Sequence, residues 1–413
     1  MSEVFDVRID SIATGGDGVG RRNGMVVFVP RTAPGDLARV RAEPHGRLMR
    51  GQLLELPEPS SQRVEPPCQH YVVDRCGGCQ IQHLLYEGQL EAKAGMIRDA
   101  ITRIGRVETD RPTVEASGNQ WRYRKKLTLA LRRVGDNGRW IAGLHRFDTS
   151  DVFELRDCLI TEDRVLDAWR LVLAQQRLLP PDKELRGAVR ALPSGFSFTL
   201  EGALDWPQRE EFFAAIPTMV ELWWQPTDRS RRLLDSRPAT EPHAGASFAQ
   251  VNPGVAEKLR GWVVSVASAL SPKTAVDAYS GTGDIAIALA QQGGGIRVVA
   301  IEIDRDATRA AAARLPSGSQ AVNARVEEAL PRALPADVVI LNPPRAGVHE
   351  RVTDTLQAQN PKPRAVIYVS CDPATLARDI RRLEGYRVQS IRGFDMFPQT
   401  AHVETVCELV PAT

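Results

Sequence analysis

One stretch decides the fold of this 413-residue chain: TAVDAYSGTGD, residues 274–284. A short apolar strand runs into a glycine-rich turn, and a helix rich in Ala, Ile and Leu follows over 285–291. A second strand over 297–303 continues the alternation of strands and helices that starts near residue 247. This alternation is typical of a parallel sheet covered by helices. The sequence therefore predicts a doubly wound α/β domain over residues 246–413.

The glycine-rich turn predicts a cofactor site. Gly281 and Gly283 let the backbone approach a ligand closely, and Glu302 stands at the spacing where an acid receives a ribose hydroxyl. Dinucleotide-binding loops carry three glycines, whereas this loop has two and is preceded by an acid, Asp277. S-adenosylmethionine has no pyrophosphate to place on a helix N-terminus. The loop therefore favours S-adenosylmethionine over a dinucleotide.

Two further strands end at the same edge of the predicted sheet. The strand over 337–341 runs into Asn342-Pro343-Pro344-Arg345, and the strand over 365–369 is followed by Cys371. A single cysteine after a strand is often only a core residue, but a thiolate at this edge can add to an electron-poor ring carbon. Glu404 lies in an apolar strand pattern, where burial would raise its pKa into the range of a general base.

The remaining sequence predicts two more domains. Residues 1–57 contain short strands over 4–9, 25–30, 37–42 and 49–56 separated by glycine-rich turns, which is typical of a small OB-like β-barrel. Prolines between 57 and 67 indicate a linker. A helical pattern over 84–105 predicts a helix that packs on the catalytic domain, inside a mixed, β-rich central domain over 58–245.

Four cysteines form a second candidate site. Cys68, Cys76 and Cys79 are close in sequence, and Cys158 follows far along the chain. The N-terminus lacks a signal-peptide pattern and no apolar run is long enough to span a membrane, so we expect a cytoplasmic protein in which disulfides are rare. Thiolates around a CxxC segment bind soft metals, and both zinc and an iron–sulfur cluster fit this pattern.

A basic stretch over residues 111–146 predicts nucleic-acid binding. It holds nine Lys and Arg against two acidic residues, a local charge of +7, although the whole chain carries only +2. Trp121, Tyr123 and Trp140 interleave with these charges. Such a pattern is expected of a groove that follows phosphates and stacks unpaired bases, and the alternative is a solvated strand face.

Five motifs, in this order along the chain, resemble the RNA uracil-5-methyltransferases that form 5-methyluridine, and the resemblance covers nearly the whole length. They are SFAQVN (247–252), DAYSG (277–281), PPRAG (343–347), SC (370–371) and FPQTAHVE (397–404).

The resemblance implies a set of site residues. For binding S-adenosylmethionine these are Gln250, Tyr279, Asp284, Glu302 and Asn342. Cys371 falls at the nucleophile and Glu404 at the proton acceptor. The resemblance also implies a [4Fe-4S] cluster held by Cys68, Cys76, Cys79 and Cys158, and it identifies residues 1–57 with the RNA-binding TRAM barrel of this family.

Three residues depart from the family's usual pattern. Asp284 and Asp372 stand where Asn is common, and Asn342 stands where Asp is common. We expect Asp284 and Asn342 to have exchanged carboxylate and amide, so that the site keeps one negative charge for the cofactor's ammonium group. We expect Asp372 to raise the pKa of the adjacent thiol, with Arg345 offsetting it.

These expectations combine into one function. A monomer without a membrane anchor would methylate C5 of a uridine in RNA, in 23S ribosomal RNA rather than transfer RNA. The Cys371 thiolate would add to C6 and Glu404 would remove the C5 proton. Two alternatives stay open at this point. One is an enzyme that methylates an exocyclic amine of RNA, which needs no thiol, and the other is a non-enzymatic iron–sulfur RNA-binding protein.

Overall fold

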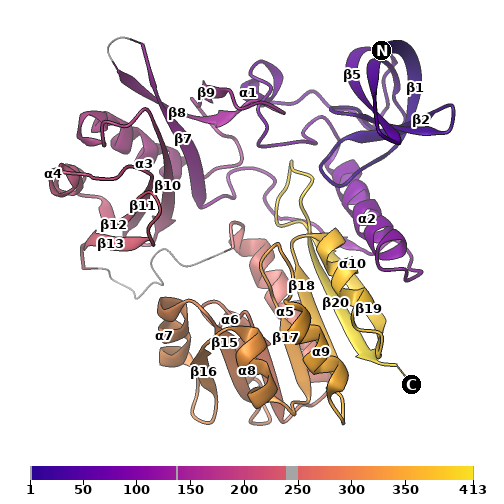
Figure 1. The fold of residues 1–413 in the computed structure, drawn as a ribbon, viewed down its shortest axis with the longest axis vertical. Coiled ribbons are helices and arrows are strands. Elements are labelled where there is room, and N and C mark those ends of the chain that lie inside the picture. Colours follow the sequence, from indigo (N-terminus) through magenta and orange to yellow (C-terminus); the bar gives the residue numbers. More distant parts are fainter. Residues whose placement is uncertain (1, 136–137, 239–249, 413) are drawn as a thin grey trace. The chain divides into compact units, whose positions relative to one another are not determined.

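The computed structural model describes residues 2–135, 138–238 and 250–412 (Figure 1). The chain forms two compact units. The first unit comprises residues 1–64, 83–118 and 253–413, and the second comprises 65–82 and 119–252. The chain therefore leaves the first unit, returns to it for one helix and one short strand, and leaves it again before the α/β domain. No helix among the described residues is both long and apolar enough to cross a membrane.

An eight-stranded sheet forms the α/β part of the first unit, with the strand order β16-β15-β14-β17-β18-β20-β19-β6. The parallel strands are β14 (Thr274–Ala278), β15 (Arg297–Glu302), β16 (Gln320–Asn323), β17 (Val338–Leu341) and β18 (Ala365–Ser370). Next to them, β20 (Glu404–Pro411) runs antiparallel between β18 and β19 (Tyr386–Phe394), and β6 (Val114–Glu115) completes the edge. The predicted doubly wound domain is confirmed.

Four helices separate the successive parallel strands: α6 (Asp284–Ala290), α7 (Arg305–Arg314), α8 (Val326–Ala333) and α9 (Glu350–Ala358) (Figure 1). Two more flank them in the chain, α5 (Pro253–Ala269) before β14 and α10 (Pro373–Arg381) after β18. Every residue of β17 and β18 is buried, so both faces of the sheet centre are covered. This explains why these strands appear in the sequence as continuous apolar runs instead of alternating ones.

The N-terminal strands close into a five-stranded barrel, as predicted. The strands are β1 (Glu3–Ile12), β2 (Gly18–Arg22), β3 (Met25–Val29), β4 (Leu37–His45) and β5 (Leu48–Glu58), in the order β1-β2-β3-β5-β4. Alternate residues of β1 point inward, so Phe5, Val7 and Ile9 are buried with apolar residues of the other strands.

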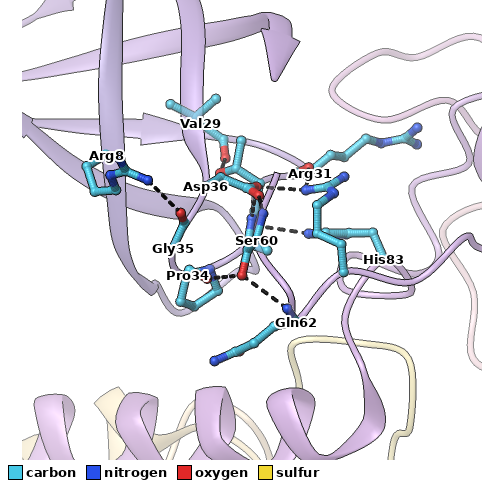
Figure 2. A network of polar contacts seen from close by, with 12 residues as sticks. Arg8, Val29, Arg31, Pro34, Gly35, Asp36, Ser60, Gln62 and His83 are labelled. Atoms are coloured by element: carbon cyan, nitrogen blue, oxygen red, sulfur yellow. Dashed lines mark hydrogen bonds and ion pairs between the residues drawn. The ribbon is translucent and has the colours of Figure 1, made fainter. Parts of the chain in front are cut away.

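A buried carboxylate fastens the chain where it leaves the barrel (Figure 2). Asp36 has no exposed surface and accepts hydrogen bonds from the backbone N–H groups of Ala33 and Ser60 and from Arg63 Nη1, at 2.6, 2.7 and 2.8 Å. His83 Nε2 lies 3.0 Å from the carbonyl oxygen of Thr32, and burial lowers the pKa of this ring to about 4. The neutral ring can therefore donate to that carbonyl, which anchors the chain just before the next helix.

That next helix, α2 (Tyr86–Arg103), coincides with the predicted helical pattern and packs on the sheet. Ile97 and Ile101 are fully buried in the core shared with β17 and β18. On its polar side, Lys93 forms a fully buried ion pair with Asp395, and Tyr86 Oη donates to the same carboxylate at 2.8 Å. The helix thus holds the loop between β19 and β20.

The second unit is built on a seven-stranded sheet with the order β13-β12-β11-β10-β7-β8-β9. The strands are β7 (Lys126–Val134), β8 (Arg139–His145), β9 (Val152–Glu154), β10 (Glu184–Leu192), β11 (Gly195–Glu201), β12 (Met219–Gln225) and β13 (Arg232–Ser236). Its helices are α1 (Gln69–Val72), α3 (Asp163–Ala174), the 3-10 turn η1 (Gln176–Leu178) and α4 (Arg209–Ala214). Residues of α3 and α4, together with Trp206, pack on one face of the sheet and form the core of this unit.

Candidate active site

The antiparallel pairing of β18 and β20 brings Cys371 and Glu404 to the same edge of the sheet. Ser370, the last residue of β18, lies opposite Thr405, so Cys371 and Glu404 follow at the adjoining strand ends. Cys371 is half-buried, and Glu404 is only 4% exposed. A thiol and a carboxyl group that are 33 residues apart in sequence thus become neighbours because one strand reverses direction.

Burial and charge set the protonation of this pair. Burial raises the pKa of Glu404 to about 7, and the positive charge of Arg345 opposes this rise. Burial, and then the charge of Glu404, raises the pKa of the Cys371 thiol, whereas the charge and a side-chain hydrogen bond of Arg345 lower it. A carboxyl group that titrates near neutral pH is suited to general base catalysis. Arg345 is therefore the residue that favours the thiolate.

The turn that carries Arg345 is seated on α10. Gly347 adopts φ +82°, and a Cβ at this position would collide with side chains of α10. Thr375 Oγ1 donates to the carbonyl oxygen of Arg345 at 3.1 Å, and Arg378 Nη2 donates to the carbonyl oxygen of Ala346 at 2.8 Å. These contacts fix the backbone that carries the Arg345 guanidinium against α10, a helix that begins just after Cys371.

A buried carboxylate, Asp379, ties these elements together. It has no exposed surface and accepts hydrogen bonds from Tyr368 Oη at 2.7 Å, from the backbone N–H of Val348 at 3.0 Å and from Arg378 Nε at 2.9 Å. These donors come from β18, from the segment that follows the Arg345 turn, and from α10. One side chain therefore fixes the strand that ends beside the thiol relative to the turn that supplies the cation.

The expected effect of Asp372 on the thiol is corrected by the structure. Asp372 is the N-cap of α10, and its Oδ1 accepts the backbone N–H groups of Ala374 and Thr375 at 2.9 and 3.0 Å. The carboxylate whose charge raises the pKa of Cys371 is Glu404. Asp372 therefore serves as a helix cap, because its carboxylate accepts hydrogen bonds from backbone N–H groups that have no partner within the first turn of the helix.

The predicted cofactor loop lies at the carboxyl ends of β14 and β15. Glu302 accepts hydrogen bonds from the backbone N–H groups of Gly281 and Asp304, both at 2.8 Å, so it orders the loop. Tyr279 adopts φ +60° and accepts the backbone N–H of His349, and burial raises its pKa to about 12. Glu302 and Tyr279 therefore lie at the loop, as the sequence predicted.

Asp277, which lies in β14 just before this loop, has a role that the sequence did not predict. It is buried, its Oδ2 accepts the N–H of Ala286 at 3.0 Å, and its Oδ1 has no partner among the described residues. Burial raises its pKa to about 7. An unsatisfied buried oxygen of this kind can accept a donor from a bound ligand. The signal in the sequence was an acid at the end of a buried strand.

The two departures near the cofactor loop each have contacts of their own, and their reciprocal exchange stays a prediction. Asp284 Oδ1 forms an ion pair with Arg314 of α7 at 2.9 Å, and both side chains are about half exposed. Asn342 is half-buried, and its backbone N–H donates to Ala278 at 3.1 Å, which places it beside the end of β14. The charge of Asp284 is therefore balanced by an arginine.

Gln250 belongs to the second unit and is half-buried there. Residues 247–249 of the same motif lie outside the described residues.

The four cysteines of the second unit come together, as predicted from their chemistry. Cys68, Cys76, Cys79 and Cys158 line one cavity of about 290 Å³. Burial raises the pKa of Cys79, and so do the charges of the other three thiols, which lie close enough to interact. Within the described part of the chain, no group of three or more His, Cys, Asp or Glu side chains is placed to hold a metal ion.

Thiols that line a cavity without converging on a single point can still hold an iron–sulfur cluster. A single ion needs its ligands to converge on a point, whereas a [4Fe-4S] cluster gives each iron its own thiolate and requires thiols spread around a volume. Four thiols around one cavity fit the second arrangement. Four cysteine thiols are a donor set that fits such a cluster, and they are also a donor set of structural zinc sites.

The positive charges of residues 111–146 are largely balanced by acidic side chains, contrary to the prediction. Its arginines pair with acidic residues that are distant in sequence. These pairs are Arg111–Glu91, Arg122–Asp157, Arg132–Glu184, Arg139–Glu154 and Arg146–Asp74. Tyr123 and Trp140 are each 3% exposed and belong to cores, so they offer no stacking surface. The sequence could not show this, because the compensating acids lie on other strands and loops.

Comparisons with known proteins agree with this architecture. A family model described as tRNA (uracil-5-)-methyltransferase matches residues 319–410. A protein of Thermosynechococcus vestitus described as an uncharacterized RNA methyltransferase is 35% identical over 98% of this chain and 97% of its own length. A Listeria monocytogenes protein with the same description is 30% identical over 99% and 98%.

A solved structure has the same fold over the full length. It is the crystal structure of Pyrococcus abyssi tRNA (uracil-54, C5)-methyltransferase in complex with S-adenosyl-L-homocysteine. The TM-score is 0.70 at 23% sequence identity, with 98% of this chain and 99% of that chain covered. The fold is that of an S-adenosylmethionine-dependent methyltransferase.

Proposed function

The chain belongs to the RNA uracil-5-methyltransferase family, and we propose that it methylates C5 of one uridine in RNA through a covalent intermediate on Cys371. The observation that carries this proposal is the grouping of a half-buried thiol, a buried carboxyl group with a pKa of about 7 and a single arginine at one sheet edge. Methylation of an exocyclic amine would need neither the thiol nor the base.

Each of the three residues has one task. The Cys371 thiolate, favoured by Arg345, adds to C6 of the uracil, and the electron pair of the C5–C6 double bond moves toward C5 and O4. When bound, S-adenosylmethionine supplies the electrophilic methyl group that C5 accepts. Glu404 then takes the proton from C5, and the electrons of that C–H bond restore the double bond and expel the thiolate. A target in folded RNA must first be turned out of its stack.

Cofactor binding is assigned to the loop at the ends of β14 and β15 and to its neighbours. We propose that Tyr279, Glu302 and Asn342 contact S-adenosylmethionine, and Gln250 and Asp284 remain in the set by resemblance. The ordering of the loop by Glu302 and the buried, unpartnered oxygen of Asp277 support this assignment. Calorimetric titration with S-adenosylmethionine tests it, and absence of binding by the intact protein would favour a non-enzymatic RNA-binding role.

We propose a [4Fe-4S] cluster on Cys68, Cys76, Cys79 and Cys158. When bound, it joins residues 68–79 covalently to residue 158. The shared cavity of the four thiols supports it. Protein purified without oxygen should be brown with broad visible absorbance, and Cys79→Ser should abolish the colour. A colourless, zinc-loaded protein would exclude the cluster.

The substrate is proposed as ribosomal RNA, 23S in particular, with the five-stranded barrel acting as an RNA-binding TRAM module. Mass-spectrometric mapping of 5-methyluridine in ribosomal and transfer RNA, from cells with and without this protein, identifies the target. Loss of the modification from transfer RNA alone would contradict the ribosomal assignment.

Two variants test the chemistry directly. Cys371→Ala should give no RNA adduct and no methylation, whereas Glu404→Gln should accumulate an adduct that survives denaturation. Cys407→Ala is a matched control, because this fully buried thiol lies on β20 close to the base and takes no part in the proposed reaction. Methylation by Cys371→Ala at the wild-type rate would exclude the covalent route and favour the exocyclic amine.

A further inference from the structure

The seven-stranded sheet of the second unit has two unlike faces. Side chains alternate along a strand, so one set of positions packs on α3 and α4 and the other set faces away. On β10, Val189 is fully buried in the core, whereas its neighbour Arg190 belongs to the opposite face and is half-buried. On β7, Leu127 is in the core and Lys126 faces away, exposed. The outward face therefore carries charged side chains that are exposed or half-buried, next to buried residues such as Ala188 and Glu221.

Positive charges gather on this outward face. Lys126 and Arg190 lie directly opposite each other on the paired strands β7 and β10. Arg186 stands on the same side of β10, four residues before Arg190, and is exposed. Arg231, just before β13, is also exposed and is close enough for its charge to act on both Lys126 and Arg190.

These cations are only partly compensated. Arg186 is paired with Glu201 at 3.1 Å, and the charge of Glu221 favours the charged form of Arg190. Lys126 forms no ion pair among the residues that the structure describes. Its side chain keeps exposed surface, but partial desolvation of the ammonium group and the charges of the neighbouring arginines lower its pKa. Like charges held together in this way are stabilised by an anion that binds between them.

An aromatic ring completes the face. Trp223 of β12 is half-buried on the outward side, while its neighbour Trp224 is buried in the core. Its indole N–H donates to Glu221 at 2.8 Å, which fixes the ring, and the guanidinium of Arg231 lies 5.7 Å from the ring centroid. A fixed ring beside cations on an open sheet is the composition of surfaces that bind single-stranded nucleic acid.

We propose that this basic sheet face, defined by Lys126, Arg186, Arg190, Trp223 and Arg231, binds the phosphate backbone of the substrate RNA outside the target nucleotide. The inference rests on the proposed function, because it assumes that the substrate is RNA. RNA is favoured over an acidic polypeptide, because its phosphates can bind the cations and its bases can stack on the Trp223 ring. An acidic polypeptide would bind the cations alone.

The test is RNA binding and turnover by the full-length enzyme with Lys126→Ala, and with the double variant Lys126→Ala/Arg190→Gln. Each lost phosphate contact should reduce the slope of log affinity against log salt by about 0.7 for a single strand. The Michaelis constant for RNA should rise about tenfold in the double variant, whereas kcat and binding of S-adenosylmethionine should stay at wild-type values. Lys126 is exposed, so its single variant keeps the fold.

Arg170→Gln is the matched control, since Arg170 is an exposed arginine on α3, which covers the opposite face of the same sheet. An unchanged salt slope and Michaelis constant in the double variant, with a wild-type enzyme that methylates RNA, would overturn the inference and leave the proposed function intact. A wild-type enzyme that methylates no RNA would instead refute the proposed function. Unchanged RNA binding with lost binding of polyglutamate would assign the face to an acidic protein and also overturn the inference.

Discussion

The pKa of Glu404 predicts how fast the covalent RNA adduct resolves at different pH values. Glu404 acts as a base only when ionised, and burial places its pKa at about 7. Because this pKa is raised, the active form is present above pH 7 and is lost as the pH falls. The ionised fraction is roughly nine-tenths at pH 8 and just under one-tenth at pH 6, a change of about tenfold.

Acidification also removes the Cys371 thiolate, so steady-state rates would mix two effects. The pKa of this thiol is itself raised, which makes adduct formation fall even more steeply with acid than adduct decay does. A pH jump separates the two steps. The adduct is formed for a few milliseconds at pH 8, the solution is brought to pH 6 or kept at pH 8, and the remaining adduct is counted on a denaturing gel over time.

We expect the wild-type adduct to decay about tenfold more slowly after the jump to pH 6. In Glu404→Gln the adduct should persist at both values, since an amide has no proton-accepting state in this range. Equal decay rates of the wild-type adduct at pH 6 and pH 8 would refute the assignment of a base with a pKa of about 7. They would mean that water or another group removes the proton.

Three further outcomes follow from the contacts around the site. Arg345→Met should raise the pKa of the Cys371 thiol, because the hydrogen bond and the charge that favour the thiolate are lost. Peptide mass spectrometry should then show slower alkylation of this thiol by iodoacetamide at neutral pH. Gly347→Ala should cost about 1–3 kcal/mol of stability and reduce turnover more than tenfold, because φ +82° and the packed α10 leave no room for a Cβ. Lys93→Met should lower the free energy of unfolding in urea by about 3–5 kcal/mol, since it leaves Asp395 buried without its cation. Arg103→Gln, which breaks an exposed pair on the same helix, should cost less than about 1 kcal/mol, and equal losses in the two variants would contradict the burial argument.

The sequence predicted the fold and the position of Cys371 at the edge of the sheet for a local reason. In a parallel sheet, the residues that follow each strand meet at one edge, so a glycine-rich turn after one strand and a cysteine after another indicate a shared site. The positions of Tyr279, Glu302 and Cys371 needed only the strand boundaries. Glu404 needed one further fact, the antiparallel insertion of β20 beside β18, which its apolar pattern did not reveal.

Charges were the part that the sequence predicted badly. Arg122, Arg132 and Arg139 appeared uncompensated along the chain, yet each pairs with an acid that the fold brings from elsewhere. Asp372 appeared to act on the thiol next to it and instead caps a helix. Coulomb energies depend on distance in space, and sequence neighbours are a poor guide to that distance once the chain has folded.

The sequence by itself therefore determined which chemical groups the protein has and along which sheet edge they stand, because strand periodicity and turn residues are local properties. The tertiary structure alone decided their protonation and their partners. It buried Glu404, brought Arg345 to the thiol through α10, and left Lys126 among like charges on an open sheet. Burial and electrostatic interactions sum over every nearby group, and only the folded chain defines which groups those are.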